Sequence, residues 1–297
     1  MVLSTERELQ TAVAAARAAG RPVALVPTMG ALHAGHLSLI QAAVAKAHEN
    51  RPFVVVSVFV NPTQFAPGED FQSYPRDPAG DHAAASAAGA DVVFQPTVTE
   101  IYPLDRKLPT FPLPAVATRW EGELRPGHFA GVCQVVARLF QMSDADRAYF
   151  GEKDYQQLQV VRAMVRDSLH DAVRVIGCPT VREPDGLALS SRNRYLSADE
   201  RRRATAISAA LQWACGRVDA DVCDAAILQS GVRTQLESAG MTVDYAAVVE
   251  AGTLEPLGRI GDVPARLLVA ARLGTTRLID NCALVAPTVR SQQDTAQ

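Results

Sequence analysis

Five short apolar runs, rich in valine and isoleucine, alternate with helical patterns in the first part of the chain. The runs are residues 23–27, 53–60, 91–96, 146–150 and 173–178. The run at 53–60, FVVVSVFV, shows no polar alternation, which is typical of a parallel strand buried on both faces. The intervening segments that we expect to be helical are residues 36–48, 78–88, 132–141 and 153–169. This alternation predicts an α/β fold with a doubly wound, Rossmann-like parallel sheet over residues 1–182.

The pattern changes after about Val181. The later segments predict two helices, at 198–217 and 221–239, and three strands, at 242–250, 265–273 and 275–281. The last two strands are joined at Leu273-Gly274, a hairpin-type connection. We therefore expect a second, smaller α+β C-terminal domain over residues 183–288 that acts as a lid, followed by a disordered polar tail at 289–297. Two long irregular stretches, 61–78 and 102–126, are candidate lids or substrate walls.

Composition narrows the class of protein. The chain has 297 residues, 48% of them apolar and 21% charged, with a formal net charge of -3 and no basic run, so nucleic acid is not an expected partner. Its first 20 residues predict an amphipathic helix instead of a signal peptide, and no stretch approaches 18 consecutive apolar residues, so we expect no membrane span. Five cysteines without CxxC spacing are typical of buried thiols in a reducing compartment, which predicts a cytoplasmic protein.

The segment PTMGALHAGH, residues 27–36, lies where the first of these strands should end and the next helix begin. At that position in a parallel sheet we expect main-chain N–H groups and the positive end of the helix to face the ligand crevice. His33 and His36 are three residues apart, so in a helix they share a face and can both donate to phosphate oxygens. Alone, such a pair is more often a solvated surface pair; its place after a strand, between glycines, favours a catalytic role. The glycine spacing does not match the dinucleotide fingerprint GxGxxG.

Polar side chains also follow the second and fourth of these runs. Asn61 and Gln64 can read hydroxyl and carboxylate groups, although a polar loop that only ends a strand has the same composition. In FGEKDYQQ, Lys153 is a point charge suited to ATP phosphates, whereas Glu152 could simply complement a helix dipole. Asp154 and Gln157 share one helical face.

Three further segments carry weaker signals. Ser190, Ser191 and Arg192 can wrap triphosphate oxygens, but serine and arginine are also common in helix-capping loops. Val181 lies just after the fifth apolar run, at the same expected edge. His128, between two glycines, is more easily read as structural than as catalytic.

Four stretches together, PTMGALHxGH, SVFVNPTQF, FGEKDYQQL and PTVREPDGLALSSRNRYL, resemble the motifs of the pantothenate synthetase (pantoate–β-alanine ligase) family in order and spacing. The resemblance is close over about residues 20–200 and looser beyond. It implies an HxGH nucleotidyltransferase fold and an ATP-dependent ligase of coenzyme A biosynthesis. The implied reaction passes through pantoyl adenylate and releases pyrophosphate and then AMP. It also implies the cofactors ATP and Mg²⁺, with magnesium ligands unknown, the small-molecule partners pantoate and β-alanine, and a homodimer.

The resemblance also assigns residues by matched position. His36 would be the proton donor, with His33 and Lys153 as its catalytic partners. Gln64, Gln157, Asn61 and Met29 would bind substrate. The nucleotide pocket would comprise Pro27, Met29, Gly30, Ala31, Leu32, His33, Ala34, Gly35, His36, Gly151, Glu152, Lys153, Asp154, Val181, Leu189, Ser190, Ser191 and Arg192. Leu189 stands where the family often has methionine, a change that keeps apolar volume and should affect ATP binding little.

Other functions stay open at this stage. A related nucleotidyltransferase would retain the nucleotide in its product, whereas the ligase releases AMP. A nucleotide sensor would bind ATP without turnover, and would leave Gln64, Lys153 and Gln157 without a joint role. A dehydrogenase is disfavoured by the glycine spacing, and a tRNA-charging enzyme by the lack of a basic anticodon-binding domain.

Overall fold

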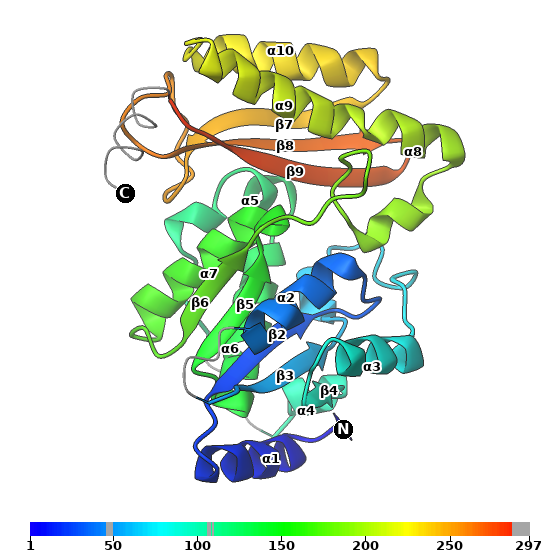
Figure 1. Ribbon diagram of the computed structural model, residues 1–297, viewed down its shortest axis with the longest axis vertical. Coiled ribbons are helices and arrows are strands. Elements are labelled where there is room, and N and C mark those ends of the chain that lie inside the picture. Colours follow the sequence, from blue (N-terminus) through cyan, green and yellow to red (C-terminus); the bar gives the residue numbers. More distant parts are fainter. Residues whose placement is uncertain (46–49, 106–107, 109, 287–297) are drawn as a thin grey trace. The chain divides into compact units, whose positions relative to one another are not determined.

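The computed structural model describes residues 1–45, 50–105, 108 and 110–286. These divide into two compact units: Met1–Glu152 with Gln156–Val181, and Lys153–Tyr155 with the chain from Arg182 onward (Figure 1). The predicted disordered tail, 289–297, and the end of the helix expected at 36–48 lie outside the described residues.

The first unit contains a six-stranded sheet in the order β1-β4-β3-β2-β5-β6, with every neighbouring pair parallel. The strands are β1 (Val2–Leu3), β2 (Val23–Thr28), β3 (Phe53–Val58), β4 (Val92–Phe94), β5 (Arg147–Gly151) and β6 (Arg174–Cys178). The doubly wound parallel sheet is therefore confirmed, and all five predicted strands form. The two-residue β1, which pairs with β4, was not predicted because it is too short to show periodicity.

Helices cover the sheet on both faces, which explains the continuous apolar runs. Ala24 and Val26 of β2 pack in one core cluster with Leu39 and Ile40 of α2, while the alternate residue Leu25 is equally buried and α6 contacts β2. The α-helices of this unit are α1 (Glu6–Ala18), α2 (Ala34–Ala45), α3 (Pro78–Ala87), α4 (Val98–Ile101), α5 (Glu121–Leu124), α6 (His128–Ser143) and α7 (Tyr155–Ser168). The irregular stretch 61–78 holds the short turn η1 (Pro62–Gln64), and the stretch 102–126 holds η2 (Ala115–Ala117) and α5. A further turn, η3 (Glu152–Asp154), follows β5.

The strand order places a topological switch point between β2 and β5. From β2 the chain winds outward through β3 to β4, and from β5 it winds the other way to β6. In open parallel sheets, ligands bind outside the carboxyl ends of the strands at such a point. The segment that follows β2 is residues 29–36, and the segment that follows β5 begins at Glu152. The fold therefore puts the first and third sequence motifs at the two strand ends that flank the switch point.

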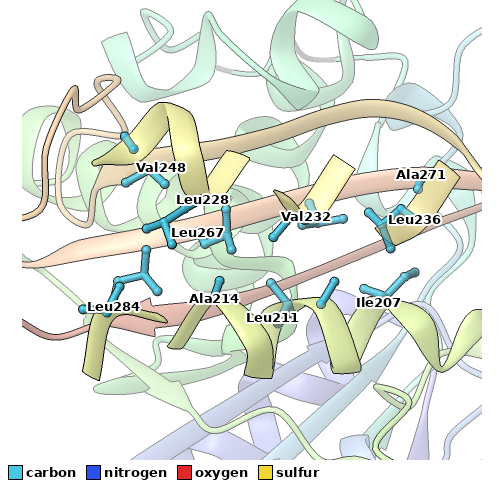
Figure 2. Packing of buried hydrophobic residues seen from close by; sticks show 14 of the residues in the cluster. Ile207, Leu211, Ala214, Leu228, Val232, Leu236, Val248, Leu267, Ala271 and Leu284 are labelled. Atoms are coloured by element: carbon cyan, nitrogen blue, oxygen red, sulfur yellow. The ribbon is translucent and has the colours of Figure 1, made fainter. Parts of the chain in front are cut away.

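The second unit packs helices on a three-stranded antiparallel sheet in the order β7-β8-β9, and α9 and α10 lie side by side on it (Figure 1). Its elements are η4 (Ser191–Tyr195), α8 (Ala198–Ala204), α9 (Ala206–Asp219), α10 (Ala225–Ser238), β7 (Thr242–Glu250), β8 (Ala265–Leu273) and β9 (Thr276–Leu284). Between helices and sheet lies an apolar core that includes Leu211, Leu228, Val232, Leu236 and Leu267 (Figure 2). The predicted smaller α+β arrangement is confirmed.

One prediction in this unit was wrong in detail. The helix expected over 198–217 is two helices that meet at Thr205. The Thr205 hydroxyl donates to the carbonyl of Arg202 at 2.8 Å, and its main-chain N–H turns to the same carbonyl at 3.4 Å. A threonine side chain that competes for a carbonyl in this way interrupts helical bonding. Among the described residues, no helix is long and apolar enough to cross a membrane.

Candidate active site

The histidine loop, residues 27–36, carries the end of β2 into the first turn of α2. Gly30 has φ +85° and Ala31 has φ +51°, so the backbone takes two successive left-handed residues. Its main-chain N–H groups find partners inside the protein. Gly30 N donates to the Thr28 hydroxyl at 3.1 Å, and Ala31 N and Leu32 N donate to Asp81 at 3.0 and 2.7 Å. The expectation that these N–H groups face a ligand is therefore wrong for residues 30–32.

The two imidazoles of the loop are held through their Nδ1 atoms. Gly35 N donates to His33 Nδ1 at 3.2 Å, and His33 N donates to His36 Nδ1 at 3.4 Å. A ring nitrogen that accepts an N–H carries no proton of its own, so both neutral rings carry the proton on Nε2. The ring centroids are 4.1 Å apart and the planes are inclined by 34°. The loop therefore presents two adjacent Nε2–H donors, which is the arrangement that a departing pyrophosphate requires.

Gln64 lies in the glutamine turn, residues 61–64, which follows β3. Its side chain is buried; Nε2 donates to Met29 Sδ at 3.1 Å, and Oε1 accepts from Asn61 Nδ2 at 3.1 Å. The contact with Met29 joins this turn to the histidine loop. The Asn61 amide is itself engaged, since Oδ1 accepts from the Tyr102 hydroxyl at 2.7 Å and from Thr63, and Nδ2 also donates to Gly131 O. Asn61 therefore holds Gln64 in place, and its amide has protein partners at both ends.

His128 supports the same turn from α6. Its Nδ1 lies 2.8 Å from the main-chain oxygen of Gln64, and its Nε2 lies 3.2 Å from an Arg125 nitrogen. Because the carbonyl needs a donor and the guanidinium needs an acceptor, His128 is neutral with its proton on Nδ1. Burial, and then the nearby charge of Arg125, lower the pKa of His128 to about 4. These contacts favour a structural role for His128.

The strand on the other side of the switch point leads to Gln156 and Gln157 of α7. Gln156 is buried and binds the irregular stretch 116–121: its Nε2 donates to Val116 O and Arg119 O, each at 2.8 Å, and its Oε1 accepts from Glu121 N at 3.0 Å. Gln157 is partly exposed and forms no hydrogen bond with another described residue. Gln156 is thus a structural clamp, while the amide of Gln157 keeps its full capacity to bind a ligand.

The remaining predicted site residues lie at the ends of elements or in the second unit. Pro27 is in β2 and Gly151 ends β5, with Glu152 directly after it; Val181 is the last residue of the first unit. Lys153 and Asp154 belong to the second unit, where Asn281 Nδ2 donates to the carbonyl of Lys153 at 3.0 Å. Lys153 Nζ lies 3.6 Å from Asp154 Oδ1. Ser190 caps η4 by accepting from Arg192 N at 3.3 Å, while Leu189 immediately precedes this cap and Ser191 begins the turn.

Sequence reasoning missed three supporting groups: Asp81, Gln156, and the ion pair of Arg125 with Glu69, whose closest atoms are 2.7 Å apart. Asp81 is 3% exposed although it lies in the first turn of α3, where an acidic residue is normally read as a solvated partner of the helix dipole. The only indication of Asp81 in the sequence is Gly30, because the close approach of a side chain to the backbone requires a glycine there. Gln156 had a weak signal as the neighbour of Gln157 in FGEKDYQQ.

The chain is similar to proteins of one family along most of its length. The family model described as pantoate-beta-alanine ligase matches residues 1–283. A pantothenate synthetase of Rubrobacter xylanophilus is 50% identical over 290 residues, which cover 95% of this chain and 98% of that protein. One from Mycolicibacterium smegmatis is 49% identical, covering 95% of this chain and 87% of that protein.

Solved structures agree with the sequence relatives. The crystal structure of pantothenate synthetase from Thermus thermophilus has a TM-score of 0.85 at 46% identity and covers 95% of this chain and 98% of its own. The pantoate-beta-alanine ligase of Francisella tularensis, solved in complex with beta-gamma ATP and beta-alanine, has a TM-score of 0.76 at 32% identity and covers 95% and 97%. On its sequence and its fold, the chain belongs to the pantoate–β-alanine ligase family.

Proposed function

We propose that residues at the switch point of the six-stranded sheet carry out the reaction of this family, the ATP-dependent condensation of (R)-pantoate with β-alanine. The observation that carries the proposal is the pair of Nε2–H donors in the histidine loop, fixed by bonds to both Nδ1 atoms. In the first step the pantoate carboxylate attacks the α-phosphorus of ATP, and the bond to pyrophosphate breaks. In the second step the β-alanine amine attacks the acyl carbon of pantoyl adenylate, and AMP leaves.

His33 and His36 stabilise the first transition state. As the P–O bond lengthens, negative charge gathers on the departing pyrophosphate, and donors that are already oriented favour that state over the bound substrate. His36 is the proton donor and His33 its phosphate-binding partner. Because the N–H groups of residues 30–32 donate to protein groups, the imidazoles supply donors that these three main-chain groups do not.

Gln64 and Gln157 hold pantoate in line for attack. Gln64 is buried and supported by Asn61 and His128, so its amide is positioned before substrate arrives. Gln157 supplies an amide that is not bonded to another described residue. Neutral amides suit a substrate with hydroxyl and carboxylate groups, because they avoid burying a second charge beside the reacting anion.

ATP binds the histidine loop together with residues 151–154, Val181 and 189–192, which match the family motifs. The relative from Francisella tularensis was solved with beta-gamma ATP and beta-alanine, which supports the same two ligands here. Mg²⁺ arrives as part of Mg–ATP. Among the described residues no group of three or more His, Cys, Asp or Glu side chains could hold a metal ion, and magnesium held chiefly by substrate phosphates needs no such group.

In this proposal the enzyme is a homodimer and lies in the cytoplasm. The five cysteines are free thiols, which suits a reducing compartment. The homodimer is what the resemblance to the family implies. That residues 183–288 act as a lid stays a prediction. It is made because an acyl adenylate must be kept from water between the two steps.

Isotopic exchange between ATP and pyrophosphate, with pantoate present and β-alanine absent, tests the assignment. We expect exchange that requires pantoate and falls about a hundredfold or more in His36→Ala, because one lost donor of this kind costs roughly 3 kcal/mol in the transition state. His170→Ala is the matched control, since His170 is exposed just after the end of α7. Exchange at the wild-type rate in His36→Ala would remove the imidazoles from the mechanism.

A further inference from the structure

A buried carboxylate lies beneath the histidine loop. Asp81, in the first turn of α3, is 3% exposed, and both of its oxygens face the loop: Oδ2 accepts from Ala31 N at 3.0 Å and Oδ1 accepts from Leu32 N at 2.7 Å. No cation among the described residues forms an ion pair with it. Two main-chain N–H groups of a loop fifty residues away therefore provide what a buried carboxylate needs in place of water.

The loop is shaped to receive this group. Successive N–H groups that follow left-handed residues form a concavity that binds anions, and the pair Gly30 and Ala31, with φ of +85° and +51°, creates one here. A Cβ at position 30 would come within 2.7 Å of Asp81 Oδ2, so glycine is required by the contact as well as by the backbone. The anion-binding concavity of the loop is thus filled by the protein's own side chain.

The carboxylate fixes the peptide units that immediately precede the first histidine. Leu32 N is held by Asp81, the next N–H, that of His33, donates to His36 Nδ1, and Gly35 N donates to His33 Nδ1. These bonds follow one another along the backbone, so a rotation of the Leu32 peptide would displace the donor that sets the His36 ring. We propose that Asp81 is a positioning residue for adenylation, which orients both imidazoles by filling the concavity of the histidine loop. This inference rests on the role proposed above for the two imidazoles.

A purely structural role for Asp81 makes different predictions. If the carboxylate only anchored α3, its loss would lower the free energy of unfolding and leave the kinetics of the folded enzyme unchanged. If it orients the imidazoles, its loss should lower the rate of the adenylation step and alter the tautomers of the two rings, with pantoate binding largely preserved. Rate, KM and imidazole state together separate the two roles.

Asp81→Asn is the main variant, because the amide keeps the shape but can accept only one of the two N–H groups. Asp77→Ala is the matched control: Asp77 caps the same helix by accepting from Gly80 N at 3.0 Å, and among the described residues its side chain forms no hydrogen bond with the histidine loop. In ATP–pyrophosphate exchange at saturating ATP, we expect Asp81→Asn to lower the rate tenfold or more and to change KM for pantoate less than twofold. Asp77→Ala should keep the wild-type rate below its unfolding temperature.

Long-range ¹H–¹⁵N spectra of the imidazoles give the second readout. In the wild type, His33 and His36 should both be Nε2–H tautomers, and in Asp81→Asn they should become mixtures. If Asp81→Asn does not fold, Asp81→Ser, which keeps one acceptor, takes its place, and the wild-type spectrum tests the premise without any variant. A wild-type rate in a folded Asp81 variant, or Nδ1–H tautomers in the wild type, would overturn the inference. If His36→Ala also exchanges normally, it is the proposed function that fails.

Discussion

Both units have an apolar core, but the first unit buries more polar side chains than the second. The first unit buries Asn61, Gln64, Asp81, His128 and Gln156, and each has a hydrogen-bonded partner from another segment. The second unit has as its core an apolar cluster between two helices and a sheet (Figure 2). Among its described residues, the polar side chains that are equally buried are Ser208, Thr276, Asp280 and Asn281.

This difference distinguishes two ways in which buried side chains contribute to a protein. An apolar core stabilises the fold through area removed from water, which is non-directional and tolerates changes that keep volume. A buried polar network fixes directions, and it is costly when one partner is missing. Substitutions in the second unit's core should therefore affect mainly the free energy of unfolding, and substitutions in the first unit's network should affect mainly the kinetics of the folded enzyme.

The largest expected effect is on stability. Leu228→Ala removes a fully buried side chain from the core of the second unit and should lower the free energy of unfolding by about 2–5 kcal/mol, through lost burial and the cavity left behind. Its neighbour Ile227 is 52% exposed on the same helix, so Ile227→Ala should change stability by less than about 0.5 kcal/mol. Urea denaturation of both variants measures the contrast. Equal losses in the two would mean that this core is not what holds the unit together.

A smaller effect, of another kind, is expected in the polar network. Asn61→Ala leaves Gln64 Oε1, Gly131 O and the Tyr102 hydroxyl without their partner, so Gln64 should lose its fixed orientation. A loss of about 1–3 kcal/mol corresponds to a rise of roughly fivefold to a hundredfold in KM for pantoate. Tyr102→Phe, which removes only one of these bonds, should show a smaller rise. Exchange kinetics at varied pantoate measure both, and an unchanged KM in Asn61→Ala would mean that Gln64 needs no support.

The fold could be predicted largely from periodicity. The continuous apolar run at 53–60 required cover on both faces, and the structure supplies it for β3. Two details escaped prediction because they depend on single contacts. The break at Thr205 arises from one hydroxyl that competes for the carbonyl of Arg202, and β1 is stabilised by its pairing with β4. Neither leaves a periodic signal in the sequence.

The site could be predicted where the residue type itself indicates the chemistry, as with His33 and His36 after a strand. It was not predictable where a contact between distant segments decides the role. Asn61 was expected to read a ligand, but the Tyr102 hydroxyl, 41 residues further along the chain, occupies its oxygen. Asp81 was not among the expected site residues, because nothing in PAGDH shows that its carboxylate accepts hydrogen bonds from the loop at 31–32.

The smallest expected effect is a dependence of stability on pH, and it separates the two units directly. The pKa of His128 is lowered to about 4 in the folded state by burial and by Arg125, whereas in the unfolded chain it lies near 6.5. Between these values the unfolded state binds a proton that the folded state does not. Stability therefore falls as pH falls below about 6.5, the loss is complete by about pH 4, and above pH 6.5 this histidine has no effect. From pH 6.5 to 5.5 it alone should cost the first unit about 1 kcal/mol.

His128→Asn isolates that contribution, because an amide can still donate to the carbonyl of Gln64 but does not titrate. Relative to the wild type, the variant should lose less stability between pH 6.5 and 5.5, whatever its stability at pH 7. Urea midpoints at the two pH values give the comparison. If His128→Asn shows the wild-type slope, the buried network around Gln64 does not hold this histidine neutral, and the contrast between a directional first unit and an apolar second unit loses its clearest electrostatic support.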